Sequence, residues 1–276
     1  MIISSTMIRE LYPKGEEKPI CPRLYHAYYI AKTHERPDGI TFMQGRYFES
    51  ALIGTSRDGV VDDLPRDKRN GKKTIDHMRI DDQILVGRQV LKFYHVEVNE
   101  HNVQAHLRMP FRGHTLEGHL DIFPTTVLDT INGELLPAIV DVKLTEDVEG
   151  TWGNFCWGSP THMDHTQALH YLHLVYNINN ELNDLSSYPE DLIRLCEDKL
   201  IHFFYFVFGY KKNKGFRNPI RINPMGKMEA YKETLRKVVS KLEMLEAQGW
   251  PPERNADLCP SCPVTDCEMK KAIVDV

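Results

Sequence analysis

Hydrophobic and polar residues alternate in the middle of the chain, whereas apolar residues recur every three or four positions on both sides of it. From residue 102 onward the alternation predicts strands, because successive side chains of a strand point to opposite faces. Asn132-Gly133 favours a hairpin, since both residues tolerate positive φ. The strands predicted from the alternation cover residues 102–109, 114–123, 125–130 and 136–144.

Helical periodicity accounts for most of the remaining chain. The clearest helix has Asn223 as its N-cap and Pro224 in its first turn. Gly249 ends this helix, and Pro251-Pro252 prevents its continuation. The apolar run 201–210 is too short to span a bilayer and predicts a buried strand. The other predicted helices cover residues 22 to about 32, 42–53, 75 to about 98, 162–177 and 189–199, and residues 54–73 are predicted to form a loop.

Composition narrows the class of protein. The chain has 276 residues, 41% of them hydrophobic, which is enough for a sizeable core. No cleavable signal sequence and no apolar stretch of about 18 residues are present, so the six cysteines predict a cytoplasmic protein whose clustered thiols are metal ligands. With a net charge of -5, binding to nucleic acid has to depend on local patches and bound metal ions.

Two basic runs are candidate contacts to nucleic acid. Residues 66–73 hold five basic residues, and residues 210–217 interleave basic residues with Tyr210 and Phe216. Basic groups hold phosphates while aromatic faces stack on bases, which is how proteins grip unpaired strands. A pair of solvated loops explains each run equally well.

Acidic residues on two predicted strands are the strongest candidates for chemistry. Asp141 and Lys143 are two residues apart and share one face of a strand. On a neighbouring strand Asp121 can join Asp141 in holding Mg²⁺ or Mn²⁺, with the carbonyl of Val142 as a further ligand. An ordinary ion pair is the alternative for Asp141 and Lys143 alone, but a charge inside an apolar strand is costly without a partner or a purpose.

Four short motifs carry a resemblance to a known family. Gly118-x-x-Asp121 followed by Asp141-x-Lys143 resembles the core motif of the PD-(D/E)XK nuclease superfamily. Gln167-x-x-x-Tyr171 resembles the helical motif of its RecB-like branch, and Gly45-x-x-x-Glu49 resembles the first motif of that branch, with Glu where His is common. The resemblance implies an α/β fold with a restriction-endonuclease-like core, a mixed sheet flanked by helices.

The same resemblance implies an activity and roles for individual residues. The expected activity is a metal-dependent DNA exonuclease, able to act also as an endonuclease, on single-stranded or end-resected DNA. A bound Mg²⁺ or Mn²⁺ would neutralise the scissile phosphate and lower the pKa of a water molecule. The resemblance implies that Lys143 orients the attacking water or stabilises the transition state, and that Gln167 and Tyr171 position the DNA or support the site. The implied metal ligands are Glu49, Asp121, Asp141 and the carbonyl of Val142.

Cysteines near the two ends of the chain form the second candidate site. Cys259-x2-Cys262-x4-Cys267 supplies three thiolates, and Cys21 is the natural fourth. Spacing alone leaves iron–sulfur and zinc equally open. The lone early cysteine resembles that of iron–sulfur nucleases such as the CRISPR-associated exonuclease and the AddB subunit. That likeness implies a [4Fe-4S] cluster joining Cys21 to a 250–276 tail, within one nuclease domain over residues 1–276.

Other residues have simpler explanations. Trp152 and Trp157 belong to a loop close to the expected path of DNA and could stack on bases. Large apolar side chains more often cover a core, and this interpretation is favoured here. Cys156 and Cys196 are predicted to be small buried residues. Metal binding is not expected of the four histidines near the predicted helix 162–177, which are His162, His165, His170 and His173.

Partners and rival functions follow from the same resemblance. The partners implied are DNA and a helicase, a recombinase or a CRISPR integrase, in recombination, repair, phage DNA metabolism or spacer processing. The chain contains no Walker loop, so no motor of its own is expected. One rival is a catalytically inactive DNA-binding subunit with a structural cluster, and another is a zinc-stapled endonuclease.

Overall fold

The computed structural model describes residues 1–13, 18–35, 39–57, 59–148, 164–212, 214–253, 259–265 and 267–269. Its chain divides into two compact units. Unit 1 consists of Met1–Pro37, Pro110–Leu116 and Gly226–Val276, and unit 2 of Asp38–Met109 and Glu117–Met225. All four cysteines proposed as ligands belong to unit 1, and all the predicted catalytic residues belong to unit 2. A single nuclease domain stays a prediction.

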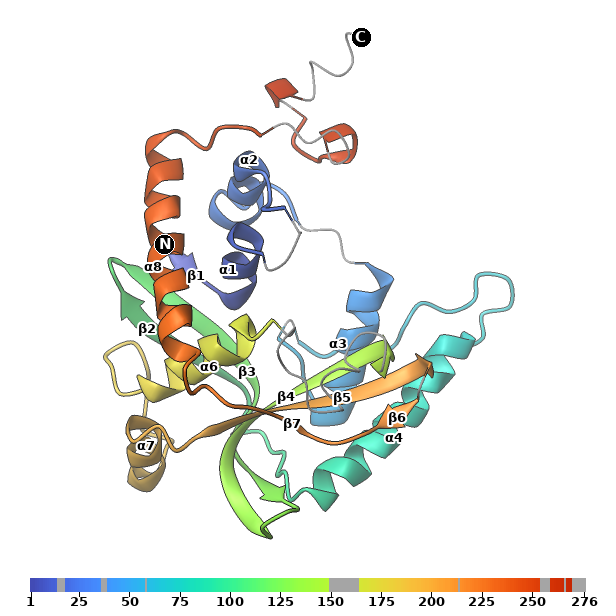
Figure 1. Ribbon diagram of the computed structural model, residues 1–276. Helices are drawn as coiled ribbons and strands as arrows, with labels where there is room; N and C mark the ends of the chain where they lie inside the picture. The colour runs from blue at the N-terminus through green and yellow to red at the C-terminus, as the bar shows by residue number, and fades with distance from the viewer. Residues whose placement is uncertain are drawn as a thin grey trace. The chain divides into compact units, whose positions relative to one another are not determined.

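The strands of the described residues form a seven-stranded mixed sheet (Figure 1). Its strands follow the order β1-β3-β4-β5-β6, with β2 beside β3 and β7 beside β5. The pairing of β3 with β4 is antiparallel and that of β4 with β5 is parallel. Helices flank this sheet, which confirms the predicted α/β class. The strands are β1 Ile2–Ile3, β2 Val103–Phe111, β3 His114–Asp129, β4 Glu134–Asp147, β5 His202–Lys212, β6 Gly215–Phe216 and β7 Ile220–Ile222.

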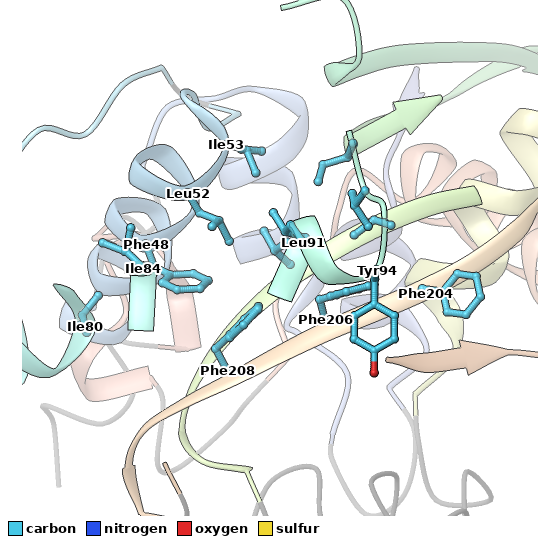
Figure 2. Packing of buried hydrophobic residues seen from close by; sticks show 14 of the residues in the cluster. Phe48, Leu52, Ile53, Ile80, Ile84, Leu91, Tyr94, Phe204, Phe206 and Phe208 are labelled. Atoms are coloured by element: carbon cyan, nitrogen blue, oxygen red, sulfur yellow. The ribbon is translucent and has the colours of Figure 1, made fainter. Parts of the chain in front are cut away.

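Strand β5 shows how the apolar face of the sheet forms the core of unit 2. Phe204, Phe206 and Phe208 are every second residue, so their rings share one face. Figure 2 shows them packed with side chains of α3 (Ile40–Ile53) and α4 (Ile75–Phe93), among them Phe48 and Leu91. Burial of such large rings is the main stabilising contribution here, at about 1.5–3 kcal/mol for each side chain. The opposite face of β5 is left for other groups.

Helices α3 and α4 pack closely because one of them has a glycine at the contact. A Cβ at Gly87 of α4 would lie 2.9 Å from Leu52 of α3, so glycine permits the approach. Thr74 caps α4 by accepting a hydrogen bond from the His77 backbone N–H at 3.1 Å. Unit 2 also contains α6 Thr166–Tyr176 and α7 Glu190–Glu197. Across the described residues, no helix is both long and apolar enough to cross a membrane.

Unit 1 combines both ends of the chain. Strand β1 pairs in parallel with Thr115 and Leu116 of β3. Helix α8 (Met228–Ala247) buries a stripe of apolar residues at the predicted three- and four-residue spacing. Next to the helix end, the Trp250 ring stacks on Tyr25 with centroids 6.0 Å apart. The remaining elements are α1 Ser5–Leu11, α2 Pro22–Tyr25, the π-helical turn η1 His26–Ile30 and the 3₁₀ turn η3 Cys259–Ser261.

The start of α8 differs from its prediction. The helix begins at Met228, with Lys227 as its N-cap, rather than after Asn223. The Asn223 side chain accepts a hydrogen bond from the Met225 backbone N–H at 2.9 Å, so it closes a local turn instead. Gly226 then adopts φ 73°, which a helix cannot continue through. The end of α8 at Ala247, two residues before Gly249, agrees with the prediction.

The strands also differ from their predictions in extent. The two predicted strands 114–123 and 125–130 form one strand, β3, whose register shifts between Ile122 and Thr125. Pro124, which has no N–H to donate, lies inside this irregularity. The predicted hairpin joins β3 and β4, but its connection runs from Asp129 to Glu134 and places Gly133 at φ 72°.

Candidate active site

The polar face of strand β4 carries the first two candidate residues. Asp141 and Lys143 lie on the face opposite to Val140 and Val142, which belong to the core of unit 2. The Lys143 Nζ lies 2.5 Å from Asp141 Oδ2. Asp141 is completely buried, whereas Lys143 keeps part of its side chain exposed. A buried carboxylate and a reachable ammonium group are thereby held side by side.

Asp121 belongs to the neighbouring strand β3 and contacts β4 through its backbone. The Val142 N–H donates a hydrogen bond to Asp121 Oδ2 at 2.9 Å. Antiparallel pairing of Ile122 with Val140 sets this position. Val142 thus contributes its N–H to the site, and its carbonyl as a metal ligand stays a prediction.

Glu49 is brought to the same site from helix α3. The Gln104 Nε2, on β2, donates a hydrogen bond to Glu49 Oε1 at 2.5 Å. The charges of Asp121, Lys143 and Asp141 all act on the pKa of Glu49, so Glu49 lies in the neighbourhood of these three charges. Gln104 was missed in the sequence, and its place in the alternating segment that became β2 was the one signal for it.

Helix α6 supplies Gln167 and Tyr171 to the site. The Gln167 Nε2 donates to Asp141 Oδ1 at 2.9 Å and to the Tyr171 hydroxyl at 3.3 Å. Tyr171 packs tightly against Gly118, where a Cβ would lie 2.9 Å from the ring and 2.8 Å from Leu174. The glycine of Gly118-x-x-Asp121 therefore allows α6 to approach β3, and Gln167 orients Asp141.

Burial shifts the pKa values of all three acids upward, and the charge of Asp121 raises those of Glu49 and Asp141 further. Burial, and then the charge of Asp121, raises the pKa of Glu49 to about 9. Burial also raises the pKa of Asp121 and raises that of Asp141 to about 7. Although burial opposes it, the charges of Asp141 and Asp121 raise the pKa of Lys143. Three acids share one ammonium group, so a divalent cation would offset the remaining negative charge.

The donor set suits a hard cation, since it consists of carboxylate oxygens, as Mg²⁺ and Mn²⁺ prefer. Among the residues that the structure describes, however, no group of three or more His, Cys, Asp or Glu side chains is arranged to hold a metal ion. The carboxylates are linked instead through Gln104, Lys143 and the Val142 N–H. Joint metal binding by Glu49, Asp121 and Asp141 stays a prediction.

The cysteines lie in short elements of unit 1. Cys21 directly precedes α2, and its Sγ accepts a hydrogen bond from the Glu253 N–H at 3.3 Å. Cys267 is buried in an apolar cluster with Ala27 and Val264, and Cys262 packs against this cluster. The segment that follows Cys21 therefore packs against the late cysteine segment. Four thiols suit iron–sulfur or zinc on chemical grounds, and the structure leaves that choice open.

Other candidate residues have structural explanations or lie outside the described part. His170 is buried, and burial lowers its pKa to about 4. Its Nε2–H donates to the Glu117 carbonyl at 2.8 Å, so a neutral imidazole helps to join α6 and β3. Cys196 is fully buried in α7. The residues outside the described ranges are Trp152, Cys156, Trp157 and His162.

The two basic runs are partly neutralised by acids. Several of their cations lie within ion-pair distance of a carboxylate, which the sequence did not show. Such pairs reduce the positive charge available to nucleic acid. The pairs are Lys73 with Asp81 at 2.6 Å, Arg66 with Asp63 at 2.9 Å, and Lys211 with Glu146 at 2.6 Å and with Asp76 at 3.1 Å.

Comparison with known proteins shows a shared fold. No protein-family profile matches the chain, and no curated protein matches it in sequence. A solved structure with a similar fold is a chain from Eubacterium rectale described as a "putative exonuclease". The two chains superpose with a TM-score of 0.54 and 13% identity, covering 96% of this chain and 88% of the other. At this identity the likeness concerns the fold alone.

Proposed function

We propose that this chain is a metal-dependent deoxyribonuclease, an exonuclease that acts on single-stranded or end-resected DNA. The observation that carries the proposal is the burial of Asp121 and Asp141 beside Lys143, with half-buried Glu49 next to them. A fold shared with a protein described as a "putative exonuclease" supports it. An ordinary surface ion pair has no need of two further acids beside it.

The residues of the chain divide the work of phosphodiester hydrolysis. Glu49, Asp121 and Asp141 would hold Mg²⁺ or Mn²⁺, which when bound lowers the pKa of water and neutralises the scissile phosphate. Lys143 places its positive charge beside Asp141, where it orients the attacking water or stabilises the charge of the transition state. Gln167, hydrogen-bonded to Asp141 and Tyr171, keeps that carboxylate oriented.

A structural metal group in unit 1 is part of the proposal. Cys21, Cys259, Cys262 and Cys267 would hold a [4Fe-4S] cluster, or zinc as the alternative. Packing of Cys267 against Ala27, six residues after Cys21, supports a group that joins the two ends of the chain.

The decisive assay is cleavage of end-labelled single- and double-stranded DNA with Mn²⁺ by anaerobically purified protein. Replacing Lys143 by Met, or Asp141 by Asn, is expected to lower kcat by about 100-fold or more, because each change removes charge stabilisation from the transition state. The matched control is Arg79→Met, since Arg79 also pairs with an aspartate, Asp76, at 3.3 Å in the same unit and lies outside both basic runs. Its activity should stay within about twofold of wild type.

Two outcomes contradict the proposal. Equal degradation of DNA by wild type and by all three variants would assign the activity to a contaminant or to another site. DNA binding by the wild type without any Mn²⁺-dependent cleavage would instead identify a catalytically inactive DNA-binding subunit.

A further inference from the structure

Gln104 makes contacts that no motif of the chain accounts for. Its Nε2 donates to Glu49 Oε1 at 2.5 Å, from β2 to α3 across 55 positions of sequence. Hydrogen bonding by Gln104 also works against the rise in pKa of both Glu49 and Asp121. Its direct contact is the hydrogen bond to Glu49, the carboxylate that helix α3 brings to the site.

The backbone at Gln104 is in a conformation that glutamine rarely adopts. Its φ is 52°, in the left-handed region that favours glycine and asparagine. Buried Asn102, two residues earlier, fixes the chain by donating to the carbonyls of Glu97 at 2.9 Å and Pro124 at 3.0 Å. The Phe123 N–H also donates to the Asn102 carbonyl at 2.7 Å. The anchored segment holds Gln104 in this conformation, in which its side chain reaches Glu49.

The oxygen of the same amide has a different environment from its nitrogen. Gln104 Oε1 is buried and has no hydrogen-bond partner in the described structure, although an unsatisfied buried acceptor is unfavourable. The amide is therefore oriented by its hydrogen bond to Glu49, which leaves the amide oxygen without a partner. An unpartnered amide oxygen next to a carboxylate cluster is also a donor atom of the type that Mg²⁺ and Mn²⁺ accept.

We propose that Gln104 is a positioning residue of the carboxylate site, whose side-chain amide holds the Glu49 carboxylate in the orientation in which it binds a divalent cation. The inference rests on the metal-dependent function proposed above. It assigns to this chain a sixth polar side chain, besides Glu49, Asp121, Asp141, Lys143 and Gln167, that determines the geometry of the site. Neighbours that orient metal ligands affect metal affinity by about 10- to 100-fold.

The test replaces Gln104 by Asn. Asparagine keeps the amide and is tolerated at positive φ, but its side chain is one methylene shorter and cannot reach Glu49 from the same backbone position. The matched control is Gln83→Asn, because Gln83 is a buried glutamine of unit 2 that also has an amide oxygen without a partner. Gln83 lies on α4 and makes no hydrogen bond to Glu49 or Asp121 in the described structure.

Mn²⁺ binding to the DNA-free protein is measured by titration calorimetry. The Kd for Mn²⁺ is expected to rise about tenfold in Gln104→Asn and to stay within about twofold in Gln83→Asn. In the cleavage assay Gln104→Asn should lower kcat about tenfold at limiting Mn²⁺ without changing KM for DNA, and excess Mn²⁺ should restore activity.

The outcomes separate this inference from the proposed function. If wild type binds Mn²⁺ and Gln104→Asn binds it equally tightly, the role of Gln104 is overturned and the nuclease proposal stands. An equal loss of affinity in Gln83→Asn would overturn it as well, because the effect would then be general loosening of unit 2. If wild type binds no Mn²⁺ at all, both proposals fall.

Discussion

The carboxylate site of unit 2 and the cysteine segment of unit 1 are held in different ways. Long strands and helices position the carboxylates, and each acid has a neighbour in Gln104, Lys143, Gln167 or the β4 backbone. The cysteines belong to short elements, such as the three-residue turn η3, packed on a small apolar cluster. The sheet can therefore preform the first site, whereas the second would depend more on the proposed metal group for its stability.

The largest change in stability is expected when one of the proposed cysteine ligands is replaced. If the cysteines hold the proposed metal group, replacing Cys267 by Ser should remove it and lower the thermal midpoint by about 10 °C or more, because a structural metal group contributes directly to folding. Iron, acid-labile sulfide and zinc contents measure the first effect, and thermal denaturation measures the second. The iron, sulfide and zinc contents of the wild type also decide between an iron–sulfur cluster and zinc.

Cys196→Ser is the matched control for this change. Cys196 is fully buried in α7, and burial raises its thiol pKa to about 12, so a serine there also tests burial of a polar group. The control should lower the thermal midpoint modestly and leave the metal content unchanged. Retention of the full iron or zinc content by Cys267→Ser would show that the thiols do not hold the metal.

A smaller effect, and of opposite sign, is expected at the carboxylate site. Replacing Glu49 by Gln should stabilise the metal-free protein at pH 8 by about 1 kcal/mol or more, equivalent to about 3 °C. Burial and the charge of Asp121 raise the pKa of Glu49 from 4.5 to about 9 in the folded state. Its contribution to stability is thus complete below pH 4.5 and is lost as the pH rises through 9.

The pH dependence supplies the control for this variant. Near pH 4 Glu49 is protonated in both folded and unfolded chains, so wild type and Glu49→Gln should unfold at similar temperatures. At pH 8 added Mn²⁺ should stabilise wild type more than the variant, since the variant lacks one proposed ligand. Equal stability of the two proteins at pH 8 without metal would mean that Glu49 is not enclosed with the other acids.

Short-range rules predicted much of the carboxylate site. Alternation along a strand placed Asp141 and Lys143 on one face, and the spacing of four placed Gln167 next to Tyr171. Gln104 escaped these rules, because its contact to Glu49 spans 55 positions and its positive φ leaves no local signal in a glutamine. Motifs show which residues share an element, and they do not show which elements meet.

The fold was predictable to a similar depth. The long apolar and periodic segments predicted strand β5 and the apolar stripe of helix α8, because burial determines which residues are apolar in both elements. The two-residue strand β1 has no readable period, and it exists because Thr115 and Leu116 supply its hydrogen-bond partners. At the start of α8 the predicted cap was wrong, since Asn223 satisfied the Met225 N–H locally before Gly226 redirected the chain.

The smallest effect, a change in affinity for DNA, is expected from single substitutions in the basic run 210–217 of unit 2. Lys211 lies 2.6 Å from Glu146 and 3.1 Å from Asp76, so its charge is already compensated. Exposed Lys212, on the same strand, makes no ion pair in the described structure. Lys212→Met should therefore raise the Kd for single-stranded DNA by about threefold at low salt, and Lys211→Met by less than about twofold.

Fluorescence anisotropy with a labelled single strand and Ca²⁺ in place of Mn²⁺ measures binding while suppressing cleavage. Because the effect of Lys212 is electrostatic, the difference between the two variants should shrink as the salt concentration rises. If Lys211→Met weakens binding more than Lys212→Met does, the ion pairs of Lys211 must open on contact with DNA. The basic run would then contact DNA through the cations that the acids Glu146 and Asp76 hold in the free protein.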